Sequence, residues 1–597
     1  MAAAVPSGVN SISQMSTRTK VVVMAGTLLG LFTAAMDQTV VGTSLPRIVA
    51  SFGGLGLFPW VFTSFMVAST TTVPIVGKLT DLFGRKPFYI AGVVILLLGS
   101  ALAGSSQNME QLIAFRAVQG IGAGMIMGIA FAIIGDVFPP AERGKWAGLM
   151  SGVFASASVI GPLIGGTLTD HVNWRWVFYV NLPLGSVALA VLFFGMPAIR
   201  PVSRPKLDYR GIALLVATVV PALLAFSWAG SRYDWASPQI IGMLSWAIAA
   251  LAIFAWAELR AAEPLLPMGL FRNPVFLVSA VVTFLTGVAM FGSLSYIPLF
   301  VQGVIGSSAT NSGFVTMPMM IAMAIASAIS GQIMSRLGRY RLLGVVGLLV
   351  MAGGVLLLSR MNVNSSNFVA TRNMVITGIG LGMSLPLFML AVQNEVPYRV
   401  MGVATSTMQF LRSVGGTMGV AIMGSLINSS LSSGLAANMP AQVREAAPPT
   451  LFQQLGNPQF LLNPQQREGV RSAFEQMGPQ GSQLYQAALL AVKTSLATAI
   501  ADAFWVAMFV VLAAVVVGVF LREAPLRSVH DLDGVPLAAD PNAARPDPAP
   551  VAPAAIPLVA GGADGETRRR PLLLAAAGVG VAFVAGLFWF LVRRGAG

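Results

Sequence analysis

The sequence predicts an all-helical protein that crosses a membrane many times. Only 10% of its 597 residues are charged and 55% are apolar, whereas roughly 25% of the residues of an average soluble protein are charged. The mean hydropathy is +0.77. Apolar residues also gather in long runs bounded by charged residues, Gly or Pro, and a helix needs roughly 20 apolar residues to cross a bilayer.

Fifteen of these runs are long enough to span a bilayer. The first follows Arg18 and Lys20 and has no small-residue cleavage site, so we expect a retained helix and not a signal peptide. The expected spans are approximately residues 21–45, 57–77, 88–106, 111–135, 146–168, 175–197, 210–229, 238–257, 274–301, 309–334, 341–359, 369–393, 400–428, 498–521 and 571–592.

Two segments between the spans are long and polar. Residues 429–497 predict a loop, within which 464–477 is either an amphipathic helix or a plain spacer. Residues 524–567 are rich in Ala, Pro and Asp, a composition that buries too little apolar surface to order itself. We expect a disordered linker there.

The short loops differ in charge from one side of the membrane to the other. Lys and Arg number fifteen in one set of alternating loops and four in the other. The positive-inside rule places the richer set and the N-terminus in the cytoplasm, with the spans in the plasma membrane, which is the inner membrane of a bacterium. The net charge of +14 therefore reflects the basic loops on one side of the membrane, and nucleic acid is not an expected partner.

The composition excludes several kinds of chemistry. The chain has no Cys, and its only His residues are His171 and His530, which excludes disulfides, thiolate metal sites and most Cys or His catalysis. No GxxxxGK[ST] stretch for ATP binding occurs. We therefore expect no enzyme, no cofactor and no metal site. The functions that remain are membrane transport and membrane structure, and we expect an ion gradient to supply the energy for transport.

Two loops in different halves of the chain repeat one pattern. Residues 77–87 read GKLTDLFGRKP and residues 331–341 read GQIMSRLGRYR. The spacing from the first Gly to the Gly-Arg pair is identical, as expected for a transporter built from two related bundles. Basic turns at an anionic leaflet would explain the Arg residues, but not Asp81 or the matched glycines.

Two intramembrane charges are expected at one depth. Asp37 lies about 25 Å past Lys20 in a hydrocarbon core roughly 30 Å thick, and Arg116 lies roughly 8 Å inside the far boundary. Each would be costly alone in lipid, so we expect both to face the protein interior and to pair. A static structural pair is one interpretation. We interpret Asp37 instead as a proton-coupling residue that Arg116 tunes, because such a site needs a group that changes its charge.

Small residues characterise the fifth span. Gly148, Gly152 and Ser156 recur at intervals of four, which lets a neighbouring helix approach closely. A Pro then follows a Gly and favours a kink. The pattern predicts a packing role for Gly152, Gly161, Pro162 and Gly165.

Arg412 is expected roughly 18 Å into the thirteenth span, so it should face a cavity or a carboxylate. Asp502, near the outer start of the fourteenth span, is the nearest candidate partner, and a helix cap is its alternative role. Met and aromatic residues either line a polyspecific pocket or pack in the ordinary way. They are Met317, Met319, Met320, Met323, Trp60, Phe62 and Phe65.

Together these stretches resemble the motifs of the major facilitator superfamily, and in particular of its fourteen-span drug:proton antiporter family. The loop from Gly77 to Arg85 is similar to the superfamily's signature cytoplasmic loop, and Ser335 departs from it where Asp81 stands in the first copy. The other matching stretches are Met36–Val41 with Leu45-Pro46, Phe115–Gly124, Gly152–Gly166, and Trp174–Trp176 with Asn181-Leu-Pro183. The similarity covers about residues 20–522.

The resemblance implies a fold of two six-helix bundles. They would occupy residues 21–198 and 274–521, with two additional spans at 210–260 between them. The remaining parts would be an N-terminal segment at 1–20, linkers at 199–209 and 522–570, and an extra span at 571–592. It also implies roles for residues of the matched motifs. Gly77, Asp81, Gly84 and Arg85 would act in a conformational switch, the fifth-span glycines would prevent proton leakage, and Gln38, Gln119, Arg412 and Asp502 are candidate cavity residues.

We therefore interpret the chain as a monomeric, proton-coupled exporter of small hydrophobic drugs or toxic compounds that exposes a central cavity to each side of the bilayer in turn. Protonation of Asp37 from outside would favour substrate release. An exporter of an endogenous lipid or metabolite is the alternative, since Arg412 would suit an anionic head group. A scaffold or receptor without transport would leave the paired motifs and buried charges unexplained.

Overall fold

The structure is a computed structural model of the chain. It describes residues 16–523 apart from gaps at 53–57, 139, 198–207, 231, 262–263, 308, 338–339, 398–399 and 479 and most of 447–463. The described residues form helices and no β-strand. The fifteenth span expected at 571–592, nearly all of the linker at 522–570 and residues 1–15 lie outside them.

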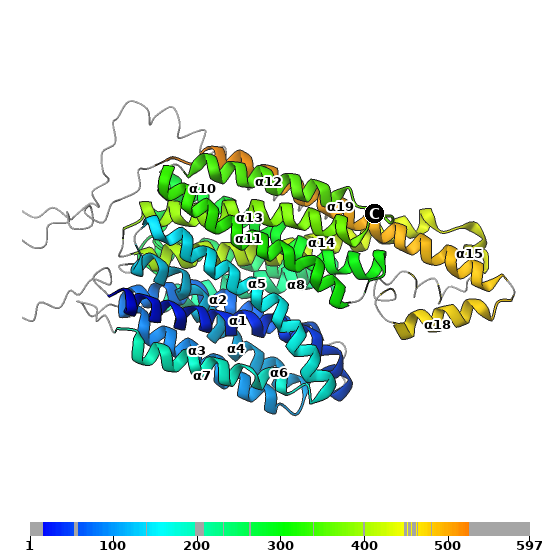
Figure 1. Ribbon diagram of the computed structural model, residues 1–597, viewed down its shortest axis with the longest axis horizontal. Coiled ribbons are helices and arrows are strands. Elements are labelled where there is room, and N and C mark those ends of the chain that lie inside the picture. Colours follow the sequence, from blue (N-terminus) through cyan, green and yellow to red (C-terminus); the bar gives the residue numbers. More distant parts are fainter. Residues whose placement is uncertain are drawn as a thin grey trace, which may run out of the picture.

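The first six spans form one bundle, drawn in blue to cyan in Figure 1. The sixth is made of two helical pieces that meet at Val180. The members are α1 (Thr17–Phe52), α2 (Phe58–Phe83), α3 (Arg85–Ser105), α4 (Met109–Val137), α5 (Pro140–His171), α6 (Trp176–Tyr179) and α7 (Asn181–Gly195).

The last six spans form the second bundle, and two additional helices precede it. The additional helices are α8 (Tyr209–Trp228) and α9 (Pro238–Glu258). The second bundle contains α10 (Pro274–Leu299), α11 (Ala309–Leu337), α12 (Arg341–Ser359), α13 (Asn367–Glu395), α14 (Met401–Asn438) and α19 (Gly481–Val519). Figure 1 shows the two bundles side by side with their helices running lengthwise.

Thirteen helices of the described residues are long and apolar enough to cross a membrane. They coincide with the expected spans, the fifth and fifteenth excepted. The fifth span is α5, a helix of 32 residues, whose many Gly, Ser and Thr residues make it less apolar than the others. The expected polytopic, all-helical fold of two bundles with two helices between them is thus confirmed.

The segment expected as a loop at 429–497 is shorter than that. α14 continues to Asn438 and α19 already begins at Gly481, because the two helices pack on each other beyond the apolar runs. The Asn438 Nδ2 atom donates a hydrogen bond to Ser495 Oγ at 3.0 Å. The remaining segment includes α15 (Ala441–Ala446) and α18 (Pro464–Glu475). Of the two alternatives for 464–477, an amphipathic helix and a plain spacer, the structure has the helix. Figure 1 shows α15 and α18 at one end of the molecule.

Glycines repeat the same helix contact in both bundles. A Cβ atom at Gly120 of α4 would overlap the Phe65 carbonyl oxygen of α2, and one at Gly378 of α13 would overlap the Met319 carbonyl oxygen of α11. Gly124 and Gly382 repeat this contact one turn later. Backbones this close are what small residues at helix interfaces permit. The two halves are therefore built alike, as the repeated loops predicted.

The bundles meet along two seams. In the α5–α11 seam, Ala328 lies 3.1 Å from the Cβ position of Gly148, so the helices touch closely. The α2–α14 seam is covered by α8, whose Leu215, Val219 and Leu223 form a hydrophobic cluster with Val67 and Ile75 of α2 and Phe410 and Val414 of α14. The Thr63 and Ser227 hydroxyls, 2.9 Å apart, add a hydrogen bond between α2 and α8.

Candidate functional site

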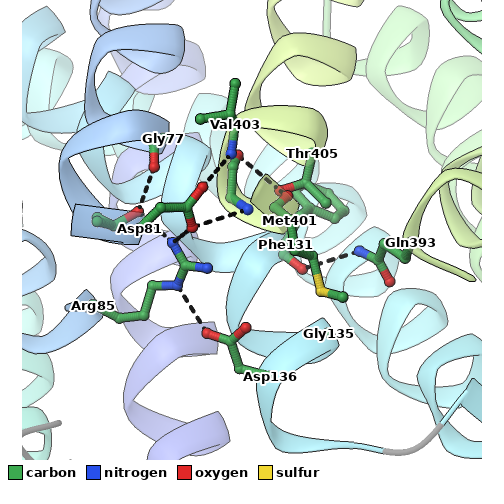
Figure 2. Close-up of polar contacts among 12 residues, drawn as sticks. Gly77, Asp81, Arg85, Phe131, Gly135, Asp136, Gln393, Met401, Val403 and Thr405 are labelled. Atoms are coloured by element: carbon green, nitrogen blue, oxygen red, sulfur yellow. Dashed lines mark hydrogen bonds and ion pairs between the residues drawn. The ribbon is translucent and has the colours of Figure 1, made fainter. Parts of the chain in front are cut away.

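A charged cluster joins the two bundles at the end that carries Lys78, Arg85, Lys86 and Arg143, which we call the basic end. Asp81 of α2 accepts hydrogen bonds from the backbone N–H groups of Gly402 at 3.1 Å and Val403 at 2.8 Å. These N–H groups belong to the first turn of α14, so a carboxylate of one bundle caps a helix of the other. Figure 2 shows this contact and its neighbours.

Arg85 ties Asp81 to a second carboxylate. Its Nη1 atom lies 2.7 Å from Asp81 Oδ1, and its Nε atom donates to Asp136 Oδ2 at 2.8 Å (Figure 2). All three side chains are at least nine-tenths buried. Asp136, at the end of α4, is covered by Arg85. The cluster therefore contains one functional candidate that sequence reasoning missed.

Two glycines give this cluster its shape. Gly84 separates α2 from α3 with φ 89°, a conformation that glycine adopts without strain. Gly77 lies against α14, where a Cβ atom would overlap Ser406 Oγ and come within 2.9 Å of the Gly402 carbonyl oxygen. The loop motif thus serves a close approach of the two bundles. The corresponding side chains of the second copy, residues 335–339, lie outside the described residues.

Asp37 of α1 and Arg116 of α4 form a fully buried ion pair, with 2.5 Å between Oδ2 and Nη1. This is the pairing that their equal depth predicted. The Arg116 guanidinium also lies 4.2 Å from the centre of the Phe65 ring, and its Nε atom donates to the Val61 carbonyl oxygen at 3.2 Å. Arg116 Nη2 is buried without a hydrogen-bond partner among the described residues.

Three further polar side chains complete the surroundings of Asp37. Gln119 Nε2 donates to Asp37 Oδ1 at 2.9 Å, and Asn181 Nδ2 of α7 donates to the same oxygen at 2.7 Å. Both also contact the Ser100 hydroxyl of α3. α4 and α7 therefore contact the Asp37 carboxylate of α1 directly, and α3 joins the network through Ser100. Gln119 was predicted to line the cavity but belongs to this network instead. The sequence indicated Asn181 only as part of the Asn181-Leu-Pro183 stretch that matches the family motif.

A cavity of about 180 Å³ lies between the bundles. The helices that line it are α1, α2, α4 and α5 and their counterparts α10, α11, α13 and α14. Its wall is mainly Met, Phe and Leu side chains, with Gln38 and Thr39 contributed by α1. Asp37 is not among the lining residues, so the ion pair lies behind the wall, one residue from it.

The other cavity candidates are divided. Arg412 lines the cavity, as do Met320 and Met323, whereas Asp502 is an exposed residue of α19 and does not. No described carboxylate pairs with Arg412, so the expected Arg412–Asp502 pair is not formed. Sequence reasoning missed the other polar lining residues, which are Ser69, Thr70, Arg143, Thr283, Gln393, Gln409 and Ser413.

The fifth-span glycines lie at two different contacts. Gly152 faces α11, with Ala324 Cβ 3.9 Å from its Cβ position, and Gly161 faces α1, where a Cβ atom would overlap Thr39 Oγ1. That hydroxyl donates to the Ala157 carbonyl oxygen at 2.9 Å. Gly165 is buried, and the side chain of Pro162 lies outside the described residues. In the part of the chain that is described, no group of His, Asp or Glu could hold a metal ion.

Comparison with known proteins gives consistent results. The sequence profile of the Major Facilitator Superfamily matches residues 27–420. The multidrug transporter protein MdtP of Bacillus subtilis is 41% identical over 410 residues, which cover 69% of this chain and 76% of that protein. Multidrug resistance protein 3 of the same bacterium is 36% identical over 515 residues, which cover 86% of this chain and 97% of that protein.

Solved structures resemble the chain in fold alone. The crystal structure of the human organic anion transporter MFSD10 has a TM-score of 0.53 at 15% identity, covering 82% of this chain and 99% of that one. A bacterial homologue of the human lysosomal transporter Spinster, in an inward-facing and unoccupied conformation, has a TM-score of 0.50 at 16% identity, covering 86% and 100%.

Proposed function

This chain belongs to the major facilitator superfamily, and on that premise we propose that it is a proton-coupled antiporter that exports hydrophobic drugs or toxic compounds. Its relatives are transporters and not enzymes, and it is a multi-pass membrane protein. Our proposal adds four points to this: the coupling to protons, the kind of substrate, the monomeric state and the orientation in the plasma membrane.

The buried Asp37 carboxylate behind the cavity wall carries this proposal. When Asp37 is ionised, its ion pair and hydrogen bonds hold α1 to α4 and α7. A proton on Asp37 removes the charge that Arg116 attracts, and that attraction is strong where water is excluded. α1 is then held less firmly. Because Gln38 and Thr39 of α1 line the cavity, protonation can change the shape of the binding site.

The charged cluster at the basic end supplies the second element of alternating access. We place this end and the N-terminus in the cytoplasm because of the positive-inside rule. Asp81, bonded to the first turn of α14, then keeps the cytoplasmic side closed. Opening that side requires these bonds to break, so the cluster would act as the conformational switch and not as a substrate site.

The cavity wall supports a broad range of apolar substrates. Met66, Met290 and Met323 lie in it together with Phe154 and Phe291. Met side chains adapt their shape at little cost, which suits a site that accepts many compounds. The two Bacillus subtilis relatives are named for multidrug transport and resistance.

The test uses the purified full-length protein in liposomes with an imposed pH gradient. Proton movement is recorded with a pH-sensitive dye as a panel of acidic, neutral and cationic hydrophobic drugs is added. For Asp37→Asn we expect no export driven by the pH gradient, while downhill exchange of substrate continues, because the amide keeps the shape of the site but cannot gain a proton.

Glu110→Gln is the matched control. It also converts a carboxylate to an amide, but Glu110 is exposed in the first turn of α4, outside the network. It should couple as the wild type does. Undiminished substrate-induced proton movement in Asp37→Asn would eliminate the proposed role of Asp37, and no drug-dependent proton movement in the wild type would eliminate proton antiport.

A further inference from the structure

The central cavity has an unbalanced charge. Among the described residues that line it, Arg143 and Arg412 carry positive charge and none is an Asp or Glu. Arg143 is satisfied by backbone, since its Nε atom donates to the Phe138 carbonyl oxygen at 2.9 Å and its Nη2 atom to that of Gly135 at 2.8 Å. The charge that remains to be explained is that of Arg412.

Arg412 lies deep between the bundles, and no carboxylate of the described residues pairs with it. It is 11 residues into α14, about 17 Å along the helix from Met401. Its guanidinium lies 5.9 Å from the centre of the Phe131 ring of α4, a favourable contact that does not neutralise the charge. Its Nε atom is buried and has no hydrogen-bond partner among the described residues. A guanidinium kept this way in a membrane protein is costly and marks a binding function.

The neighbours of Arg412 divide the cavity into a polar and an apolar part. Gln409 and Ser413 accompany it on the same helix, and Gln409 Oε1 is likewise buried without a hydrogen-bond partner. Phe291, Leu294, Met320 and Met323 of α10 and α11 contribute apolar surface. The cavity thus offers the Arg412 guanidinium, with the backbone-bonded Arg143 as a second positive charge, beside groups that suit a flat or branched apolar body.

From this arrangement we infer that the preferred substrates are amphipathic carboxylic acids, whose carboxylate pairs with Arg412 and whose apolar body lies against the Met and Phe side chains. The inference rests on the proposed export function and names its substrate class. A guanidinium binds a carboxylate through two parallel N–H donors. A hydrophobic cation would instead meet an unpaired like charge, which selects against it.

The experiment compares three probes that share a naphthyl body and differ in charge. They are 1-naphthylacetate, its uncharged methyl ester and the 1-naphthylmethyl-trimethylammonium cation. Equilibrium binding of each radiolabelled probe is measured to the full-length protein in lipid nanodiscs, with empty nanodiscs subtracted. The wild type should bind the acid about tenfold or more tightly than the ester, the ratio that one charge-assisted hydrogen-bonded pair provides.

Variants assign the preference to Arg412. Arg412→Gln should lose about tenfold or more in affinity for the acid and change the ester by less than about twofold, since only the charged pair is removed. The affinity of Arg412→Lys for the acid should lie between those of the wild type and Arg412→Gln, because lysine keeps the positive charge but not the planar pair of N–H donors. Lys145→Gln, an exposed charge on α5, should behave as the wild type.

Two outcomes overturn the inference. One is a wild-type protein that binds the cation as tightly as the acid or more tightly, which needs no variant to fold. The other is a preference for the acid that persists in Arg412→Gln. Liposome transport separates this inference from the proposed function. Proton-driven export of the cation alone would leave antiport standing and refute the substrate class, whereas Arg412-dependent acid binding without proton movement would do the reverse.

Discussion

Asp81 accepts a hydrogen bond from the backbone N–H of Val403 at 2.8 Å, although the two residues belong to different bundles. The bond is made to the start of a helix, where unsatisfied N–H groups and the helix dipole favour a negative charge. It joins the bundles only while they are close together at the basic end. This relationship is the basis of the first two predictions.

Asp81→Asn should slow transport and leave substrate affinity nearly unchanged. Losing the charged cap weakens the closed state by about 1–2 kcal/mol, roughly a 5- to 30-fold shift toward conformations open at the basic end. The chain has no Cys, so spin labels on cysteines introduced in α2 and α14 can measure that shift. Asp208→Asn is the control, because Asp208 caps its own helix α8 through Gly211 N–H. A more than tenfold loss of affinity in Asp81→Asn would instead indicate a substrate-binding residue.

Gly77→Ala should open the same end through packing. Its Cβ atom would overlap the Ser406 side chain, and such overpacking costs typically about 1–3 kcal/mol. Adding Ser406→Gly removes the two side-chain atoms that overlap most and leaves only the 2.9 Å approach to the Gly402 carbonyl oxygen, so it should restore part of the transport rate. The same labels measure the closed population. If the double variant were as slow as the single one, contact with Ser406 would not be the cause.

Removing Arg116 should destabilise the protein more than removing the whole pair. Arg116→Ala leaves the buried Asp37 charge without its cation, with only the Gln119 and Asn181 hydrogen bonds. Breaking a buried pair this way typically costs about 3–5 kcal/mol, whereas apolar replacement of both members is often neutral. We therefore expect the thermal midpoint of Arg116→Ala to fall well below that of Asp37→Leu/Arg116→Met. The double variant should still lack proton coupling in liposomes. Coupled transport by it would show that the pair is only structural.

Two glycines of α5, five residues apart, should respond differently to the same substitution. Gly161→Ala displaces the Thr39 hydroxyl from Ala157 and should cost about 1–3 kcal/mol. Gly166→Ala meets nothing within 4 Å and should be neutral or stabilising by about 0.5–1 kcal/mol, the usual effect of replacing a helical Gly. Thermal unfolding and transport rate, measured side by side, check both. Equal losses would contradict the packing assignment of Gly161.

The sequence predicted how far along its helix a buried side chain lies, but not the direction in which that side chain points around the helix. Counting residues from the membrane boundary placed Asp37 and Arg116 at one height, and they do pair. The same counting could not show that Gln119 faces Asp37 and not the cavity. α4, which carries Gln119, is apolar with almost no amphipathic periodicity, so its sequence gives no facing direction.

The ends of the long helices were also beyond reach of the sequence. α19 begins at Gly481, well before the apolar run at 498, because it packs on the extension of α14. Asp502 consequently lies within α19 and not at its start, and its side chain is exposed, so it neither caps the helix nor pairs with Arg412. The loop from Gly77 to Arg85 was predictable as a motif. The groups that donate hydrogen bonds to its Asp81 are the backbone N–H groups of Gly402 and Val403, which no side-chain pattern reveals.

α8 covers the α2–α14 seam, so the two seams between the bundles present different surfaces to the surrounding lipids. Leu215, Val219 and Leu223 fill the outer surface of the α2–α14 seam. Among the described residues no helix covers the α5–α11 seam in this way, and Ile325 of α11, next to the seam residue Ala324, is 55% exposed. Within the described part of the chain, the α5–α11 flank is therefore the one that a compound dissolved in the bilayer meets directly, and bulky groups attached along that flank should hinder such a compound where the same groups on α8 do not.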